Sequence, residues 1–180
     1  MITLRTSLLT AAFFIASLAG ADTARAPDSS GAHGFDFEVG NWRVHHRIKR
    51  PTGEWYEFDG TCSLRLLMGG PANVEEHIFQ RPTGKTYGVA VRAYDAEKDH
   101  WSIWWLDSRY MSLMGDPSIG RFENGVGNFY SDYKDPQGKT VRGRLQWSQI
   151  TPTSARWEQA QSSDGGKTWE PNWIMTFERK

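Results

Sequence analysis

The side chains best suited to acid–base chemistry are one histidine and a short acidic segment. His46 follows Trp42 and Val44 at every second position, so a strand here would turn all three toward the interior. One interpretation of His46 is a buried histidine with a hydrogen-bond partner. The others are a ligand contact, a general base or a haem ligand.

The acidic segment is Glu75-Glu76-His77, and its orientation is ambiguous. If Val74 faces the interior, so does Glu76, whereas an inward Phe79 would turn Glu75 and His77 inward. A carboxylate reaches the interior either way, and without a partner its pKa would rise into a range suited to proton transfer. His46 with such a glutamate is the acid–base pair that the sequence offers, and a solvated glutamate at a strand end is the alternative.

The single cysteine, Cys62, excludes a disulfide within the chain, a zinc site built on cysteines and an iron–sulfur cluster. Cys62 is an even number of positions from Tyr56 and Phe58, so in a strand all three point to the same face. This predicts that Cys62 is a small hydrophobic residue facing the interior. Because His45 and His46 are adjacent in a strand, they point to opposite faces and cannot share a metal. We therefore predict no metal and no cofactor, with haem on His46 or His77 as the alternative.

Nine tryptophans are the most informative feature of the composition. Aromatic side chains of inward parity can fill a barrel, or they can line a pocket for a flat or apolar ligand held by a few polar groups. The predicted ligand-binding residues are Trp42, His46, Tyr56, Glu76, Tyr87, Trp105, Trp147, Gln149, Trp157, Gln159 and Trp173. No catalytic residue is predicted.

These residues need strands to position them, and the chain alternates between apolar and polar residues over most of its length. Turn sequences such as Arg-Pro-Thr-Gly at 50–53 separate the alternating segments. In one segment Tyr87, Val89 and Val91 are expected on one face and Arg92 on the other. The predicted strands are 41–49, 54–67, 72–80, 85–95, 100–107, 118–123, 126–134, 139–149, 153–162 and 169–179.

About ten short strands joined by tight turns predict an all-β, antiparallel up-and-down barrel, with a two-sheet sandwich as the alternative. Closure removes the sheet edges, and a barrel of about eight or more strands can hold one small ligand. Residues 162–169 (SSDGGKTW) fit the S-x-D-x-G-x-T-W pattern of the hairpin repeated in sialidase propellers. It occurs once, so we expect a structural turn tied by Asp164, with Trp169 packed beneath it.

The first segment is typical of export. Arg5 precedes an apolar run at 8–18, which is too short to cross a bilayer and is followed by the small residues Ala19-Gly20-Ala21. We expect a signal peptide at 1–21 cleaved after Ala21, a flexible lead-in at 22–34 and one barrel domain at 35–180, in the periplasm or secreted. Lys plus Arg and Asp plus Glu each number 21, which argues against nucleic acid as a partner.

Several segments together resemble a bacterial protein family known as domain of unknown function 1579. They are GNWRVHHR (40–47), EFDGTC (57–62), NVEE (73–76), WSIWWLDSR (101–109), GRFENGVGNFY (120–130), TPTSARWEQA (151–160), DGGKTWE (164–170) and NWIMTF (172–177). The resemblance implies a calycin barrel of the lipocalin type. It implies no catalytic residues, because no activity is established for the family.

The sequence therefore predicts an exported β-barrel without a membrane span that binds a small apolar or aromatic molecule in its interior. One alternative is an enzyme, such as a hydrolase, isomerase or decarboxylase, that uses His46 with a buried glutamate. The other is a filled barrel that serves as a scaffold for protein interactions.

Overall fold

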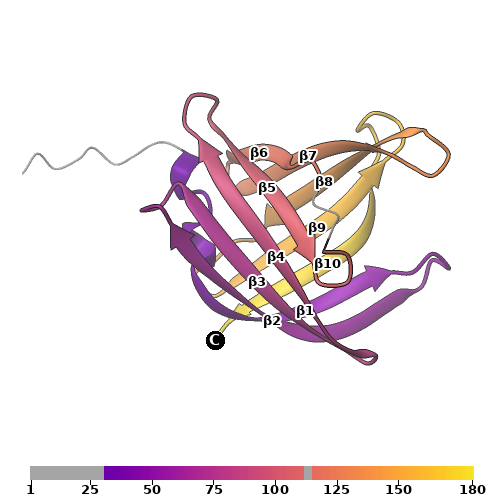
Figure 1. The fold of residues 1–180 in the computed structure, drawn as a ribbon, viewed down its shortest axis with the longest axis horizontal. Helices are drawn as coiled ribbons and strands as arrows, with labels where there is room; N and C mark the ends of the chain where they lie inside the picture. The colour runs from indigo at the N-terminus through magenta and orange to yellow at the C-terminus, as the bar shows by residue number, and fades with distance from the viewer. Residues whose placement is uncertain (1–30, 112–114) are drawn as a thin grey trace, which may run out of the picture.

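Ten antiparallel strands follow one another around a closed barrel in the computed structural model, which describes residues 31–111 and 115–180 (Figure 1). The strands are β1 (Gly40–Lys49), β2 (Trp55–Leu67), β3 (Ala72–Arg81), β4 (Gly84–Asp95), β5 (His100–Asp107), β6 (Ser118–Glu123), β7 (Val126–Lys134), β8 (Thr140–Ser148), β9 (Ser154–Ser162) and β10 (Glu170–Arg179). Each strand pairs with its neighbours in sequence. The predicted all-β barrel is confirmed.

Pairing between the first and the last strand closes the barrel. It runs from Trp42 opposite Arg179 to Ile48 opposite Trp173. Because this seam leaves no break in the ring of ten strands, the alternative of two separate sheets is wrong. The predicted signal peptide at 1–21 lies outside the described residues. Within the part of the chain that is described, no helix is long and apolar enough to cross a membrane.

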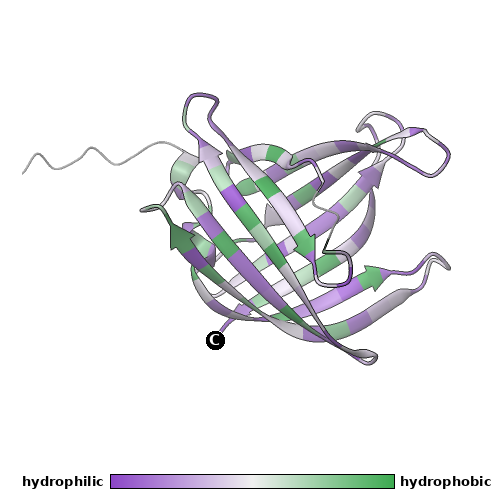
Figure 2. Ribbon diagram, in the orientation of Figure 1, coloured by the Kyte–Doolittle hydropathy of each residue, from purple (hydrophilic) through white to green (hydrophobic). Residues whose placement is uncertain are grey.

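Alternation places one set of side chains inside the barrel and the other in solvent, and apolar and polar bands follow each other along the strands in Figure 2. The interior set is rich in aromatic rings, which pack edge to face as well as stacked. The buried core consists of Phe35, Trp42, Val44, Cys62, Ala90, Trp101, Ile103, Phe129, Trp147, Ala155, Trp157, Met175 and Phe177.

Two short 3-10 helices, η1 (Gly31–His33) and η2 (Asp36–Glu38), close one end of the barrel. Phe35 lies between them, with its ring centroid 5.0 Å from those of both Trp101 and Phe122. Trp101 Nε1 donates a hydrogen bond to the carbonyl of Gly31 at 2.8 Å. Residues at the end of the expected flexible lead-in thus form η1 instead.

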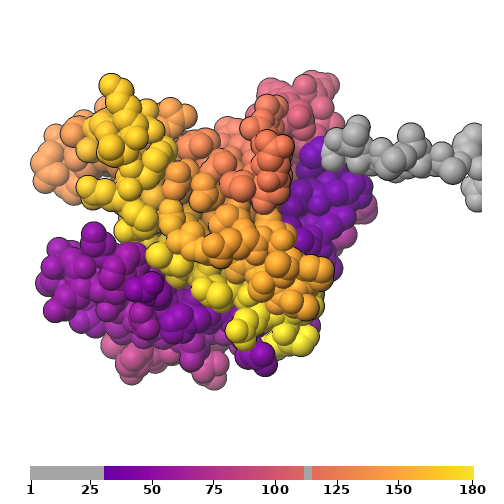
Figure 3. Space-filling model, turned by 180° about the vertical axis from the view of Figure 1, so that it is seen from behind, coloured from indigo at the N-terminus to yellow at the C-terminus, as the bar shows by residue number. Residues whose placement is uncertain are grey.

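The shortest strand pairing in the barrel is the one between β5 and β6. Only Trp101, Ser102 and Ile103 of β5 have partners in β6, so Trp104 to Asp107 have no strand partner on that side among the described residues. The hairpins β1–β2 and β9–β10 stand apart on the far side, where the surface is hollowed between them (Figure 3). The barrel is therefore plugged at the η1–η2 end and less tightly built elsewhere.

The parity expected for β4 is wrong. Arg92 is inside and 3% exposed, whereas Tyr87 is 45% exposed on the outer face. The inner face of β4 carries Gly88 and Ala90, which are small enough to leave room for interior tryptophans. Alternation predicts the wrong inner face for β4 because the apolar side chains of Tyr87, Val89 and Val91 lie on the outer face, whereas the inner face carries the charged Arg92.

The hairpin between β9 and β10 has the expected structure. Asp164 accepts hydrogen bonds from the backbone amides of Lys167 and Thr168 at 3.0 Å each and from the Thr168 hydroxyl at 2.7 Å. Ser162 Oγ donates to Asp164 at 2.7 Å. Trp169 packs near Gly166 and beneath the Arg144 guanidinium, which lies 4.7 Å from its ring. The motif is a structural turn.

Candidate functional site

A cavity of about 380 Å³ lies inside the barrel. Its walls come from β5 to β10 and from the segment just before β6, and its floor comes from β3 and β4. The lining residues are Glu75, His77, Ala90, Arg92, Ile103, Trp105, Gly115, Asp116, Ser118, Ser131, Tyr133, Gly143, Leu145, Trp147, Trp157, Gln159, Ala160, Gln161, Trp173 and Met175. The volume suits one small molecule.

Four tryptophans give the cavity flat, apolar walls. Trp173 lies edge to face with both Trp157 and Trp105, at centroid distances of 5.5 and 6.3 Å. Trp147 is 1% exposed, and its indole Nε1 has no hydrogen-bond partner among the described residues. Buried N–H groups rarely lack a partner, so this indole is a lining side chain whose donor the described residues leave unsatisfied.

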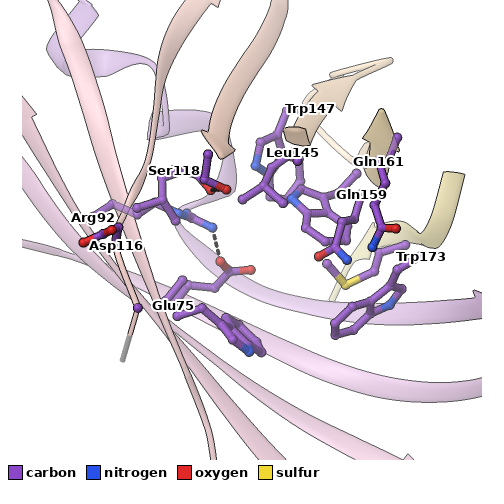
Figure 4. Close-up of a pocket in the computed structure, with 18 of the residues that line it drawn as sticks. Glu75, Arg92, Asp116, Ser118, Leu145, Trp147, Gln159, Gln161 and Trp173 are labelled. Carbon is purple, nitrogen blue, oxygen red and sulfur yellow. Dashed lines mark hydrogen bonds and ion pairs between the residues drawn. The ribbon is translucent and has the colours of Figure 1, made fainter. Parts of the chain in front are cut away.

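The floor of the cavity is charged. Arg92 Nη1 donates to Glu38 Oε2 at 2.7 Å, and Arg92 Nη2 donates to Glu75 Oε2. The three side chains are at most 3% exposed. Figure 4 shows Glu75 and Arg92 on one side of the cavity and Trp147, Gln159 and Trp173 on the other.

His77 lies beside Glu75 on β3, and its Nε2 is 2.5 Å from Glu75 Oε1. Burial lowers the pKa of His77 to about 4, although the charge of Glu38 opposes that shift. Cys62 Sγ donates to the same Glu75 oxygen at 3.3 Å. Burial, followed by the charge of Glu38, raises the pKa of the Cys62 thiol well above its ordinary value. The cysteine is therefore protonated and a poor nucleophile.

His46 is fully buried, but it does not line the cavity. Its ring stacks on Phe58 at 4.7 Å, and Trp173 Nε1 donates to its Nδ1 at 3.3 Å. Burial lowers the pKa of His46 to about 2, with further lowering from nearby His77 and Arg81. The acid–base pair of the interior is thus His77 with Glu75, and the predicted pairing of His46 with a glutamate is wrong.

Five of the predicted ligand-binding residues line the cavity: Trp105, Trp147, Trp157, Gln159 and Trp173. The structure places Trp42 and Tyr56 elsewhere. Trp42 is buried in the plugged end, where its Nε1 donates to the Glu38 carbonyl at 2.7 Å. Tyr56 packs against Phe58 and beneath Arg50. Neither touches the cavity.

Three predicted residues lie on the outside of the barrel. Glu76 is exposed because β3 turns Glu75 and His77 inward. Tyr87 is exposed because β4 has the opposite parity to the one expected. Gln149 has a positive φ of 52° in the turn after β8, so the strand parity does not extend to it.

The polar floor is the part of the site that alternation predicts least well. Alternation leaves the orientation of Glu75 and His77 open, and it predicts Arg92 on the wrong face. It does not point to Glu38, which enters the barrel from η2 rather than from a strand. Nothing along β4 marks Arg92 as buried, because its carboxylate partners come from η2 and β3.

Comparisons with solved structures show the fold. The S-type phycobiliprotein lyase CpeS from Guillardia theta superposes with a TM-score of 0.59 at 12% identity, over 85% of this chain and 94% of the lyase. Rv2717c from M. tuberculosis superposes with a TM-score of 0.57 at 11% identity, over 86% of this chain and 98% of its own. The chain therefore has the same kind of closed β-barrel fold as these two proteins. No family profile and no curated protein sequence matches it.

Proposed function

We propose that the barrel binds a small, flat, aromatic or largely apolar molecule in its interior cavity. The observation that carries the proposal is the cavity of about 380 Å³ with four tryptophans in its wall and an unpartnered indole N–H at Trp147. Tryptophan faces bind flat apolar rings well, and a few polar groups fix the orientation of the ligand.

The charged floor adds a requirement for one polar end on the ligand. Glu75 and Arg92 lie across the cavity from Trp173 in Figure 4, and His77 also lines the cavity. A ligand that is apolar throughout would cover these groups without offering them a hydrogen bond, which is unfavourable. We therefore favour an aromatic molecule with one hydrogen-bonding substituent. The phycobiliprotein lyase has the same fold, and that likeness supports a barrel fold alone.

The test uses the mature protein and N-phenyl-1-naphthylamine, an uncharged aromatic probe whose emission rises in apolar surroundings. We expect saturable binding with quenching of tryptophan fluorescence, and an affinity at least tenfold lower in Trp157→Ala, because that variant loses one wall of the cavity. Trp169→Ala is the matched control, since Trp169 lies in the β9–β10 turn and does not line the cavity.

Native mass spectrometry of protein purified from its own host identifies the ligand. A bound small molecule that is lost from Trp157→Ala supports the proposal, and a haem would show itself by its mass and Soret band. Absence of any bound molecule, together with no saturable probe binding, would overturn the proposal. The scaffold alternative would then be the better explanation.

A second candidate function is acid–base catalysis on the bound molecule, favoured by the contact of 2.5 Å between His77 and Glu75 at the cavity floor. Imidazole and carboxylate are the side chains most often used to move protons in active sites. Incubation of the identified ligand with the protein should then give a changed mass, and Glu75→Gln should abolish the change. If the mass of the ligand does not change, the catalytic function is rejected and only the binding function remains.

We also propose that the protein is exported and belongs to the family known as domain of unknown function 1579. The charged start, the apolar run at 8–18 and Ala19-Gly20-Ala21 support export. Amino-terminal sequencing of protein from the periplasm should start at Asp22. An intact start at Met1 in the cytoplasm would overturn this part of the proposal.

A further inference from the structure

Five buried side chains meet where η2 enters the barrel: Glu38, Cys62, Glu75, His77 and Arg92, each at most 3% exposed. The carboxylates of Glu38 and Glu75 share one basic partner, the guanidinium of Arg92. The Cys62 thiol and the His77 imidazole lie against the Glu75 carboxylate on its other side. Two acidic side chains with one basic partner make a buried cluster in which a second cation would be stabilised.

Arg92 fixes the direction of both carboxylates. It holds the Oε2 atoms of Glu38 and Glu75, which leaves the two Oε1 atoms facing Cys62. Cys62 Sγ lies 3.9 Å from Glu38 Oε1 and 3.3 Å from Glu75 Oε1. The imidazole Nε2 of His77 reaches the same Glu75 oxygen from β3. One sulfur, one nitrogen and one oxygen donor thus converge on one point.

We propose that Cys62, Glu75 and His77 form a site for a divalent transition-metal ion, with zinc the best match. Their donor atoms all lie within 4.8 Å of one another. Zinc binds sulfur at about 2.3 Å and nitrogen or oxygen at about 2.0–2.2 Å, so tetrahedral donors lie roughly 3.3–3.6 Å apart. The Sγ to Oε1 distance of 3.3 Å already fits, and the ion would replace the proton between His77 and Glu75.

The charges balance when the ion is bound. A coordinated thiol gives up its proton, which leaves to solvent through the cavity as the ion enters, so the site gains one negative charge from Cys62. The thiolate and the carboxylates of Glu38 and Glu75 then carry three negative charges, which the ion and Arg92 neutralise. The proton of His77 moves to Nδ1, which has no other hydrogen-bond partner among the described residues. No oxidation or reduction is involved.

A buried amide next to the cluster is an independent indication of a missing partner. Asn73 is 0% exposed, and neither its Oδ1 nor its Nδ2 has a hydrogen-bond partner within the described part of the chain. It lies directly opposite Arg92 in the β3–β4 register and two residues before Glu75, on the same inner face. An ordered water usually satisfies such a group, and a water is also the fourth ligand that an open zinc site takes.

The ion would have three protein ligands and an open position. Glu75 and His77 line the cavity, so the ion can enter through it. Three protein ligands with an exchangeable fourth position are typical of zinc sites that bind small molecules or water. The single cysteine excludes a site of several thiolates, but it is sufficient for a mixed site with histidine and glutamate. The proposed ion differs from the expectation, drawn from the sequence, that the protein holds no metal.

The test titrates the chelator-treated, full-length mature protein with cobalt(II) chloride. Tetrahedral cobalt bound to a thiolate gives a near-ultraviolet charge-transfer band and visible bands, which zinc chloride should then displace at one equivalent. Cys62→Ser should lose the charge-transfer band and bind zinc at least 100-fold more weakly. His46→Gln is the matched control: it is a buried histidine whose ring centroid lies 6.1 Å from that of His77, and none of its atoms belongs to the donor set.

Wild-type protein without a cobalt–thiolate band would overturn the inference whatever the variants do. Equal zinc affinity in Cys62→Ser and wild type would overturn it as well. If Cys62→Ser does not fold, His77→Gln serves in its place, with the near-ultraviolet circular dichroism of each variant as the check on folding. The readout is independent of probe binding in the cavity, so it can fail while the proposed function stands.

Discussion

The indole of Trp105 occupies the space that a β-carbon on Gly88 would need, so the glycine of β4 and the tryptophan of β5 fit together at the cavity wall. Phe79 lies close on another side, 3.0 Å from the same position. The orientation of one cavity tryptophan is therefore set by the absence of a side chain on the neighbouring strand.

Gly88→Ala should lower the free energy of unfolding by about 1–3 kcal/mol, because the added methyl group overpacks the wall and displaces Trp105. Urea unfolding measures the change. In a protein that already carries Trp105→Ala, Gly88→Ala should change the free energy of unfolding only slightly, because the indole that it would displace is absent. Equal costs in the two backgrounds would show that the two residues do not constrain each other.

Arg92→Met should destabilise the barrel by about 3–5 kcal/mol, because it leaves the carboxylates of Glu38 and Glu75 buried and uncompensated. Adding Glu38→Gln to that variant should restore part of the loss, and chemical denaturation at pH 7 is the measurement. Arg43→Met is the control. Its ion pair with Glu178 is 3.5 Å long and largely exposed, so its loss should change stability by less than about 0.5 kcal/mol. A double variant no more stable than Arg92→Met contradicts the argument.

His46 should make the wild-type barrel less stable in mild acid. Burial lowers its pKa to about 2, whereas the unfolded chain binds a proton at His46 below pH 6.5. Between these values the unfolded state holds more protons, so stability is fully present above pH 6.5 and falls as the pH drops. The loss from this group alone reaches about 2–3 kcal/mol at pH 4.5.

His46→Gln removes that contribution, so the difference in unfolding free energy between variant and wild type should shift in favour of the variant as the pH falls from 7 to 4.5. The matched control is His45→Gln, because His45 lies on the exposed face of β1. Parallel pH curves for wild type and His46→Gln would refute the prediction.

Asp164→Ala should loosen the turn between β9 and β10. Hydrogen bonds from Thr168, Ser162 and Lys167 lower the pKa of Asp164, and the amides of Lys167 and Thr168 lose their acceptor in the variant. We expect hydrogen exchange at these two amides to become at least tenfold faster at pH 7.

The difference in melting temperature between Asp164→Ala and wild type should shrink below about pH 4, where the unfolded carboxyl is protonated. The pKa of Asp164 is lower in the folded than in the unfolded protein. Its carboxylate therefore stabilises the fold above the unfolded pKa, and this stabilisation is lost as the pH falls. A difference independent of pH would show that the charge of Asp164 does not support the turn. Lys139→Ala, in the β7–β8 turn, is a control without this dependence.

The strands could be predicted closely because turn residues and alternation act locally. The predicted segment 100–107 coincides with β5, and 126–134 coincides with β7. The interior face was predictable wherever it was apolar, as at Trp147 or Trp173. The burial of apolar surface puts these side chains inside the barrel, and the same tendency produces the alternating pattern that predicts them.

The polar floor could not be predicted in the same way. Arg92 is inside only because Glu38 and Glu75 meet it there, and Glu38 arrives from a 3-10 helix 54 residues earlier in the chain. Alternation on one strand carries no information about such a partner. Which tryptophans border the cavity and which fill the core also depends on the long-range fit, as Trp42 shows by packing against Phe177.

The seam between β1 and β10 has a consequence for synthesis. Val44 pairs with Phe177, and the last pair of the seam joins Trp42 to Arg179, so the ring has no closing strand until the carboxyl end of β10 has left the ribosome. Until then β1 and β9 both present unpaired backbone edges to other chains. A chain that lacks β10 is therefore an open sheet with two unpaired edges, and the pairing of β10 with β1 is the step that closes it into a barrel.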